Sequence, residues 1–339
     1  MSMLSTPEIL RLATIDDYLG AADGRFFGTG YRRVSHRFHD ERAEETAALT
    51  ARCSIDCPSD WSRKGSFDQR PHLSTIDVLV IAAQFAELLL LRTFALTDED
   101  RARMWVRKVL IRAGSAPVED SLDDLPVTAK IRQTQSDEGS DAVTGVSVSV
   151  ASLAVRLEIV HPGERCESRT PVGSMSDLLG ASDRRGYGDG FRNQRVEIRD
   201  VVIDRVGTTA AATSWVSDVS EREGRLGMEA LYQPSVSLVS AFVEALQLGQ
   251  VLLYELDGVE RARSSTLWMR RTVLEVATPY RSIESPGQVT VGLGVAQSLT
   301  RGGERWRVAD IVSTRPGIKT MCSVAHRLGD SGISVQEPS

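Results

Sequence analysis

The sequence has few of the features that mark secreted proteins or nucleic-acid-binding proteins. Cysteine is scarce, with 4 in 339 residues. The amino-terminal residues have neither the basic region nor the long apolar stretch of a secretory signal. We therefore expect a cytoplasmic protein with free thiols. The net charge of −6 argues against a basic footprint for a nucleic-acid partner.

Long apolar runs are also scarce. The most apolar segment, VLVIAAQFAELLLL at residues 78–91, is too short to span a bilayer, and Gln84 and Glu87 interrupt it. We therefore expect no membrane partner. Because the segment is apolar on nearly every face, it predicts a buried helix rather than a surface helix.

Several motifs for metal, cofactor and hydrolase chemistry are missing. Cys53 and Cys57 have no second pair, and His36 and His39 lie in a charged, strand-like context, so a four-ligand metal site is not expected. The glycines at 28–30 have no third glycine at dinucleotide-binding spacing. No serine lies in a Gly-x-Ser-x-Gly elbow. We expect no metal, no cofactor and no hydrolase triad.

The sequence does contain an internal repeat. Matching segments recur in the same order at shifts near 160 residues, which indicates a duplicated chain. They are FGTGYR at 27–32 and YGDGFR at 187–192, TAALT at 46–50 and TAAAT at 209–213, the apolar segments from 78 and from 238, RAR at 101–103 and 261–263, and Pro-Gly at 162–163 and 316–317.

The order of elements within one copy predicts an α+β fold. A helix that is apolar on every face needs a curved sheet and a partner to bury it. We therefore predict a double hot-dog fold, in which each copy is an antiparallel sheet wrapped around one long buried helix. The expected elements of the first copy are strands at 31–38 and 45–55, a polar loop at 58–70, the helix to about 93, a charged connection at 95–104, and strands at 105–112, 127–135 and 143–160.

The repeat also suggests domain boundaries. We expect a helical lead-in at 1–23, a first copy at 24–165, a linker at 166–183, a second copy at 184–320 and a polar tail at 321–339. The linker is rich in serine, glycine and charge, as a connection between two copies should be.

The candidate active site is PHLSTID at residues 71–77, in front of the first apolar helix. Ser74 and Asp77 have the spacing of a capping box. In paired hot dogs the pockets lie where the helix start of one unit meets the sheet of the other. His72 would transfer protons near neutral pH, with Asp77 orienting it or taking the proton itself. Amides around residues 74–77 would hold a thioester or enolate oxygen.

The second copy has diverged at this point. At the matching positions it has Tyr232 in place of the histidine, no aspartate, and Glu244 where the first helix has Gln84. We therefore predict one asymmetric site. Its catalytic residues would be His72, Asp77 and Glu244, and its substrate-binding residues would be Ser74, Thr75, Gln84, Tyr232, Gln233, Arg32 and Arg192.

Purely structural interpretations stay open for these residues. Asp77 would then be only a capping carboxylate, and His72 an exposed loop residue. The polar groups of the buried helices, including Glu87, would pair with arginines on strands such as Arg107 and Arg270. Arg32 and Arg192 each follow a Gly-x-Gly turn. Either they bind a phosphate or a carboxylate, or they are solvated arginines at the ends of strands. The second interpretation is favoured.

Four segments of the chain resemble the AvrD family, named for an avirulence protein of plant-pathogenic bacteria. They are YLG at 18–20, RFFGTGY at 25–31, PSDWSRK at 58–64 and, most clearly, PHLSTID at 71–77. The resemblance covers at least residues 14–320. It implies a relation to the hot-dog enzymes that make γ-butyrolactone signals, and synthesis of syringolide-like acyl glycosides. It supplies no catalytic residues.

The leading hypothesis is therefore an acyltransferase that joins a β-ketoacyl group to a ketopentose such as xylulose. Its expected partners are a β-ketoacyl-carrier protein or acyl-CoA and the small sugar acceptor. Two alternatives stay open: a dehydratase or thioesterase of the double hot-dog class, and a non-catalytic protein that binds an acyl ligand. The sequence leaves open whether the chain forms a homodimer.

Overall fold

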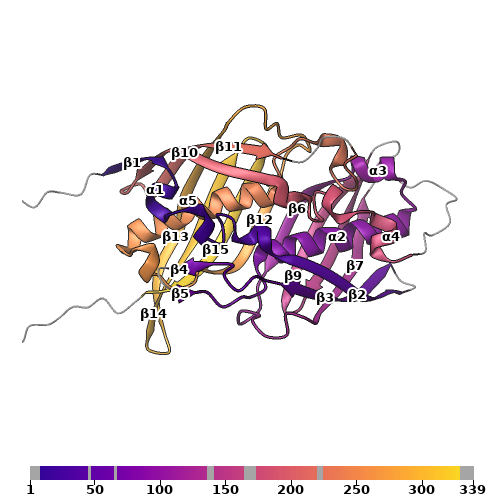
Figure 1. Ribbon diagram of the computed structural model, residues 1–339, viewed down its shortest axis with the longest axis horizontal. Coiled ribbons are helices and arrows are strands. Elements are labelled where there is room, and N and C mark those ends of the chain that lie inside the picture. Colours follow the sequence, from indigo (N-terminus) through magenta and orange to yellow (C-terminus); the bar gives the residue numbers. More distant parts are fainter. Residues whose placement is uncertain are drawn as a thin grey trace, which may run out of the picture.

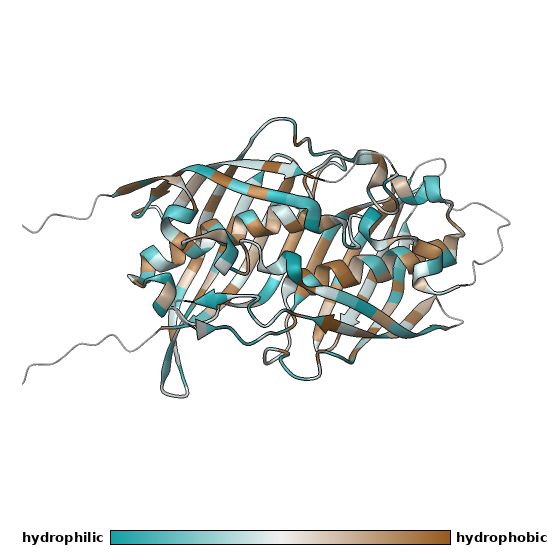
Figure 2. Cartoon of the chain, in the orientation of Figure 1, coloured by the Kyte–Doolittle hydropathy of each residue, from teal (hydrophilic) through white to brown (hydrophobic). Residues whose placement is uncertain are grey.

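Two long helices, each lying across the concave face of an antiparallel sheet, organise the chain (Figure 1). The computed structural model describes residues 8–44, 47–64, 67–135, 141–163, 173–219 and 224–328. Figure 2 shows brown, apolar turns in both helices and strands banded with alternating brown and pale or teal residues. The core therefore lies between each helix and its sheet.

The first copy wraps six strands around helix α2 (Thr75–Phe94). Its strands are paired in the order β2-β3-β7-β8-β9-β6, and every pairing is antiparallel. Helix α3 (Asp98–Arg103) follows α2 in the chain, and a small hairpin that precedes α2 contacts η6 (Arg261–Arg263) of the second copy. The strands are β2 (Ser35–Glu44), β3 (Ala48–Asp56), β6 (Trp105–Arg112), β7 (Leu125–Gln135), β8 (Ala142–Val150) and β9 (Leu153–His161), and the hairpin is β4 (Arg63–Lys64) with β5 (Phe67–Asp68).

The second copy repeats this arrangement around helix α5 (Leu238–Asp257). Its strand order, β10-β11-β13-β14-β15-β12, matches that of the first copy element by element. The strands are β10 (Gln194–Asp204), β11 (Thr209–Asp218), β12 (Trp268–Val276), β13 (Gly287–Arg301), β14 (Glu304–Arg315) and β15 (Ile318–Arg327).

Strands β6 and β12 join the two copies into one continuous sheet. They pair antiparallel, with Ile111 opposite Thr272 and Val109 opposite Leu274. The joined sheet has 13 strands, including β1 (Ile9–Thr14) at the edge beside β10. This topology confirms the predicted double hot-dog fold and the internal duplication.

The sequence of α2 explains its position. Ser74 caps the helix: its hydroxyl accepts a bond from the Asp77 amide, and the Asp77 carboxylate accepts one from the Ser74 amide. Residues from Ile76 to Leu91 are all buried. On the facing strand β8, buried and half-buried residues alternate along the whole strand, as expected for a strand with one face toward a core.

Two short arms exchange between the copies. The first arm, residues 16–33, contains α1 (Asp16–Leu19), η1 (Ala22–Gly24) and η2 (Gly30–Arg33). The second arm, residues 175–193, contains α4 (Met175–Leu179), η3 (Ser182–Arg184) and η4 (Gly190–Asn193). Each arm packs on the helix of the other copy. Tyr18 donates a 2.6 Å bond to Glu255 on α5, and Arg101 beside α2 donates to the Leu179 carbonyl at 3.0 Å.

The arms revise the predicted boundaries. The expected lead-in at 1–23 is not simply helical, because residues 9–14 form β1, which pairs with β10 of the second copy. The expected linker at 166–183 already contains α4 and the start of η3, and the rest of it up to residue 172 lies outside the described residues. The second copy continues beyond residue 320, because β15 ends only at Arg327.

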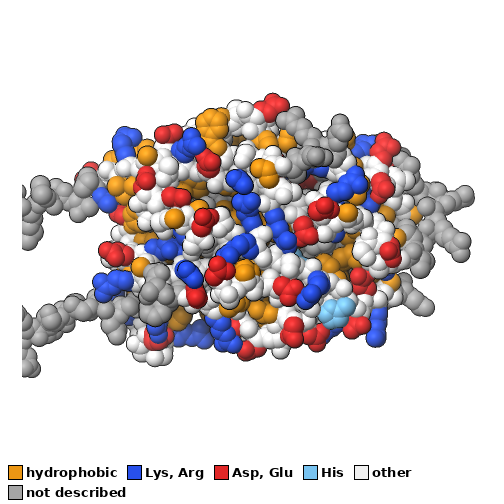
Figure 3. All heavy atoms as spheres, in the orientation of Figure 1, with side chains coloured by type: hydrophobic (Ala, Val, Ile, Leu, Met, Phe, Trp, Pro, Cys, Tyr) orange, Lys and Arg blue, Asp and Glu red, His pale blue; other side chains and the backbone are white. Residues whose placement is uncertain are grey.

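One face of the molecule carries basic and acidic side chains close together (Figure 3). Blue and red groups are interspersed across this face, and no extended basic surface covers it. Such mixed charge differs from the clustered Lys and Arg side chains of a nucleic-acid-binding face.

The Gly-x-Gly turn of each arm has a steric origin. A Cβ atom on Gly28 would lie 2.1 Å from the Ala22 carbonyl oxygen, and one on Gly188 would lie 2.2 Å from the Ser182 carbonyl oxygen. These distances are too short for any side chain. The turn therefore recurs because the backbone of each arm folds tightly on itself.

We expect Gly28→Ala to destabilise the protein by about 1–3 kcal/mol, because the backbone of the arm must move to accept the methyl group. Gly24→Ala is the matched control, since a Cβ atom there meets nothing within 4 Å. Thermal unfolding of both variants tests this explanation. Equal melting temperatures for the two variants would contradict it.

Candidate functional site

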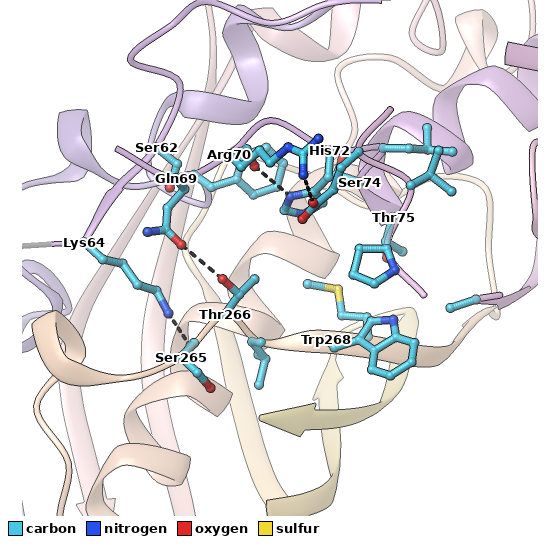
Figure 4. Close-up of a pocket in the computed structure, with 18 of the residues that line it drawn as sticks. Ser62, Lys64, Gln69, Arg70, His72, Ser74, Thr75, Ser265, Thr266 and Trp268 are labelled. Carbon is cyan, nitrogen blue, oxygen red and sulfur yellow. Dashed lines mark hydrogen bonds and ion pairs between the residues drawn. The ribbon is translucent and has the colours of Figure 1, made fainter. Parts of the chain in front are cut away.

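A cavity of about 500 Å³ lies at the start of α2, where the two copies meet (Figure 4). The first copy contributes His72, Ser74 and Thr75 to its walls. The second copy contributes Gln250 on α5 and Trp268 on β12. The cavity thus lies where the start of one helix faces the other copy.

The lining of this cavity combines apolar surface with a few charged groups. Apolar side chains include Trp61, Leu73, Val118, Leu153, Met269 and Trp306. Charged side chains include Lys64, Arg70, Glu119, Arg261, Glu304 and Arg327. Mostly apolar walls with a few placed polar groups are typical of sites for small organic ligands.

Polar contacts between the copies hold the cavity together (Figure 4). The Lys64 ammonium donates to the Ser264 hydroxyl at 3.1 Å and also to the Ser265 carbonyl. The Thr266 hydroxyl donates to Gln69 at 3.1 Å. Burial and, secondarily, the charge of Arg261 lower the pKa of Lys64 to about 8. The ammonium is therefore a cation that begins to lose its charge just above neutral pH.

His72 is held by aromatic and backbone contacts. Its ring meets the Trp61 ring edge to face at 5.0 Å between centroids. Its Nδ1 lies 3.2 Å from the Arg70 carbonyl oxygen. A carbonyl oxygen only accepts hydrogen bonds, so Nδ1 carries the proton in the neutral ring and Nε2 has the free lone pair. In this tautomer Nε2 is the ring atom that can accept a proton.

Asp77 does not contact His72. One carboxylate oxygen, Oδ2, accepts bonds from the Ser74 amide at 2.9 Å and the Ser74 hydroxyl at 2.6 Å. The other, Oδ1, lies 2.9 Å from Nε2 of His36 on β2. The predicted pairing of Asp77 with His72 is therefore wrong, because the capping box turns the carboxylate away from the cavity and toward the sheet.

The pair of Asp77 and His36 is deeply buried, with 2% and 4% of the two side chains exposed. Burial raises the pKa of Asp77, but the hydrogen bond and charge of His36 and the bonds from Ser74 act in the other direction, and the net pKa is lowered. Asp77 is thus a fixed anion rather than a proton acceptor at neutral pH. The alternation of inward residues Val34, His36 and Phe38 was the signal that sequence reasoning missed.

Glu244 is also remote from the cavity lining. It is fully buried, and it accepts bonds from the Ser214 hydroxyl at 2.6 Å and from Arg315 at 2.6 and 2.7 Å. Burial raises its pKa, although Arg315 and Ser214 act in the opposite direction. Glu244 therefore lies in a structural ion pair, as the alternative interpretation held, with Arg315 in place of the expected Arg270.

The remaining predicted residues lie in three other places. Gln84 lines a second, smaller cavity with His36. Tyr232 donates to the Arg103 carbonyl at 3.1 Å, and Gln233 accepts from the Ser235 amide at 3.1 Å. The two predicted arginines meet between the arms, where Arg32 donates to the Arg192 carbonyl at 2.7 Å. None of these five residues lines the larger cavity.

The corresponding part of the second copy is filled by a buried polar network. At the 160-residue shift of the arms, Phe27 of the cavity corresponds to Tyr187. At the helices the shift is 163, because the N-caps are Ser74 and Ser237, so the predicted matches of His72 with Tyr232 and of Gln84 with Glu244 are wrong. Glu229 accepts bonds from Arg281 at 2.6 Å and from the Tyr187 hydroxyl at 3.1 Å. The two pseudo-equivalent sites have therefore diverged. The site of the first copy is a cavity, and that of the second copy is a network of hydrogen bonds and an ion pair that stabilises the fold.

The described residues contain neither a cluster of metal-binding side chains nor a helix of membrane-spanning length and apolarity. Within them, no group of three or more His, Cys, Asp and Glu side chains is arranged to hold a metal ion. No helix in the same part of the chain is long and apolar enough to cross a membrane. Cys53, Cys57 and Cys322 are free thiols, and Cys166 lies outside the described residues.

Comparison with known proteins gives one family match. The family model described as Pseudomonas avirulence D protein (AvrD) matches residues 11–329. No curated protein sequence matches the chain.

Solved structures resemble the chain only distantly. A 12:0-ACP thioesterase from Umbellularia californica is 8% identical, with 84% of this chain and all (100%) of that chain covered and a TM-score of 0.36. The dehydratase domain of the polyketide PpsC from Mycobacterium tuberculosis is 11% identical, with 86% of this chain and 96% of that chain covered and a TM-score of 0.33. A protein with a hot dog fold from Alicyclobacillus acidocaldarius is 9% identical, with 85% and 95% covered and a TM-score of 0.35. The fold assignment therefore rests on the chain's own topology.

We expect Asp77→Ala to destabilise the protein by about 3–5 kcal/mol, because it breaks a buried ion pair and leaves His36 alone. Asp177→Ala is the matched control. Asp177 makes the same capping box with Ser174 but is exposed and has no histidine partner. Asp177→Ala should therefore lower the free energy of unfolding by clearly less than Asp77→Ala does. Urea unfolding of both variants at neutral pH measures the difference.

The same pair predicts an acid dependence. The pKa of Asp77 is lower in the folded protein than its ordinary value of 3.8. The ionised carboxylate therefore adds to the free energy of unfolding above pH 3.8, and this stabilisation is lost as the pH falls through the pKa of the folded state. Between about pH 4 and pH 2, the wild type should therefore lose stability more steeply than Asp77→Ala. Parallel stability curves for the two proteins would rule out the assigned charge state.

Proposed function

The chain belongs to the AvrD family, and we propose that it transfers a β-ketoacyl group from a thioester to a hydroxyl of a small sugar such as xylulose. The thioester would be carried by an acyl-carrier protein or by CoA. The products would be syringolide-like acyl glycosides, as the family resemblance implies. The observation that carries the proposal is the cavity at the start of α2, whose mainly apolar lining includes His72, with Nδ1 on the Arg70 carbonyl and no hydrogen bond from Nε2 to a described residue.

In the proposed reaction His72 acts as the general base. Its Nε2 removes the proton from the acceptor hydroxyl, and the resulting alkoxide oxygen forms a bond to the thioester carbonyl carbon. The carbonyl oxygen becomes an oxyanion. When the tetrahedral intermediate collapses, the carbon–sulfur bond breaks, and the thiolate leaves with the proton that His72 had taken. The bonds and protons balance without a cofactor.

The first turn of α2 is suited to hold that oxyanion. The capping box already uses the amides of Ser74 and Asp77. The amides of Thr75 and Ile76 precede the first residue that can bond within the helix, so they have no intrahelical acceptor. Thr75 also lines the cavity. A preorganised amide directed at the developing charge is typically worth about 3–4 kcal/mol.

The apolar walls would bind the acyl chain. Trp61, Leu73, Leu153 and Trp268 provide surface from both copies. Each buried methylene of the chain contributes about 0.8 kcal/mol. A cavity of about 500 Å³ lies within the roughly 300–1,000 Å³ of pockets for small organic ligands. It therefore has room for an acyl chain and a small acceptor together.

A thioesterase or dehydratase would use the same cavity differently. In a thioesterase, water would replace the sugar hydroxyl beside His72. A dehydratase would need an acid to protonate the leaving hydroxyl, and Asp77 is not in place to do so because it faces His36. An acyl-binding protein would hold the thioester without turnover. The geometry of His72 favours acyl transfer to water or to a hydroxyl.

Mass spectrometry of the purified chain with a β-ketoacyl thioester, with and without xylulose, tests the proposal. An acyl–sugar mass only in the complete mixture is the expected result. Free acid without sugar would support a thioesterase, and a dehydrated thioester would support a dehydratase. A bound thioester without any product would favour the binding protein.

We expect His72→Gln to lower kcat/KM by about 10²–10⁴-fold, because this is the usual contribution of a positioned general base. The change should appear in kcat, with a melting temperature close to that of the wild type. His39→Gln is the matched control. His39 is an exposed histidine on β2, 3.5 Å from Asp124 and outside the cavity. Full turnover by His72→Gln would remove His72 from the mechanism.

A further inference from the structure

A second cavity, of about 260 Å³, lies between the first copy and the second arm. Its walls include His36 on β2 and Gln84 on α2 from the first copy. The second arm contributes Ser176, Ser182 and Arg185. Figure 1 shows α4 of this arm lying beside the carboxyl-terminal part of α2. None of these five residues lines the larger cavity.

Arg185 is the unusual group in this cavity. Only 4% of its surface is exposed, and its Nε and Nη1 atoms are buried with no hydrogen-bond partner among the described residues. A buried charge without partners is costly, so natural proteins rarely leave one. Burial also lowers the pKa of Arg185, and Glu87 opposes this only in part. Among the described residues, no carboxylate forms an ion pair with this guanidinium.

The carboxylates nearby are occupied by other groups. Glu87 accepts two bonds from Arg101, at 3.0 and 2.7 Å. Asp189 accepts a bond from Ser182 at 2.5 Å and pairs with Arg192 at 2.8 Å. Glu41 accepts a 2.6 Å bond from the Met175 amide. These acids give the region a balancing charge, but none of them bonds to Arg185.

The duplication supplies an internal comparison. Arg25 of the first arm corresponds to Arg185 at a shift of 160 residues. Arg25 is fully paired: it bonds to the Ala21 carbonyl, to Gln247 at 2.7 Å and to the Asp16 carboxylate. The residue that corresponds to Asp16 in the second arm is Ser176. The second copy has therefore lost the carboxylate that neutralises this arginine in the first copy.

We propose that the second cavity binds a small hydroxy acid, whose carboxylate neutralises Arg185 as Asp16 neutralises Arg25. Arginine presents a planar fork of donors that matches a carboxylate in two bonds. The Gln84 amide lines the cavity and has no hydrogen bond to a described residue, so it is available to a hydroxyl of the ligand. The site thus recognises an acid that carries at least one further polar group.

The size of the cavity limits the ligand. Its volume of about 260 Å³ is just below the roughly 300–1,000 Å³ of pockets for drug-sized molecules. An acid with only a few carbon atoms fits this space, and a long acyl chain does not. The site is separate from the proposed acyl-transfer cavity, so its test is independent of that reaction.

The first experiment measures the melting temperature of the full chain with glycolate, glycolamide or inorganic phosphate. Glycolate should raise the melting temperature in a concentration-dependent way, because a ligand that binds only the folded state stabilises it. Glycolamide has the same shape without the charge and should have no effect. A rise with phosphate alone would overturn the assignment to a carboxylic acid. No rise with any probe would overturn the site.

The decisive variant is Ser176→Asp, which restores in the second arm the carboxylate of the first. We expect it to raise the melting temperature without ligand and to lower glycolate affinity by about tenfold or more. Ser298→Asp adds the same charge at an exposed position on β13 and should change neither quantity. Undiminished glycolate binding by Ser176→Asp would overturn the proposal.

A second variant, Arg185→Met, tests the site independently, so that the proposal can still be judged if Ser176→Asp does not fold. It removes the unpaired charge but keeps a long side chain, so it should raise the melting temperature of the ligand-free protein and abolish the effect of glycolate. A lower melting temperature together with retained glycolate binding would show that Arg185 is not the anion-binding group.

Discussion

Burial of the two central helices is the constraint on which the rest of the structure depends. Helix α2 is buried on every face from Ile76 to Leu91, and α5 is buried along most of its length. One curved sheet covers only part of such a helix. The remaining surface is covered by the exchanged arms and by the second copy, which joins the first through β6 and β12. The arms are therefore part of the core of the copy that they cross to, and neither half of the chain has a complete core alone.

Polar side chains within these helices then determine where each arm fits. In α5, Gln247 bonds to Arg25 of the first arm at 2.7 Å. In α2, Glu87 bonds to Arg101, which also donates to two carbonyls of the second arm. Because an unpaired polar group inside an apolar helix is costly, each of these residues fixes the position of a segment far away in the sequence. The cavities lie beside these contacts, where a corresponding residue has changed.

Local patterns in the sequence were sufficient to predict much of the fold. The alternation at 105–112 matched β6, and the capping box marked the start of α2. Pairings between distant segments were not predictable from such patterns. Residues 9–14 form a strand only because β10 lies beside them, and residues 31–33 form part of η2 rather than a strand because Tyr31 stacks on Phe191 of the other arm. For the same reason nearness in sequence predicts a pair of Asp77 and His72, whereas the fold brings His36 of β2 to Asp77.

Joining two hot dogs in one chain removes a restriction that applies to every symmetric dimer. In a homodimer each substitution occurs at both equivalent positions, so a change that improves one site changes the other as well. In this chain Asp16 and Ser176, and likewise Phe27 and Tyr187, are equivalent positions with different residues. One member of each pair lies in a paired structural contact, and the other lines a cavity. Gene fusion thus lets half of an ancestral symmetric interface keep the protein folded while the other half accumulates changes that a homodimer would not tolerate.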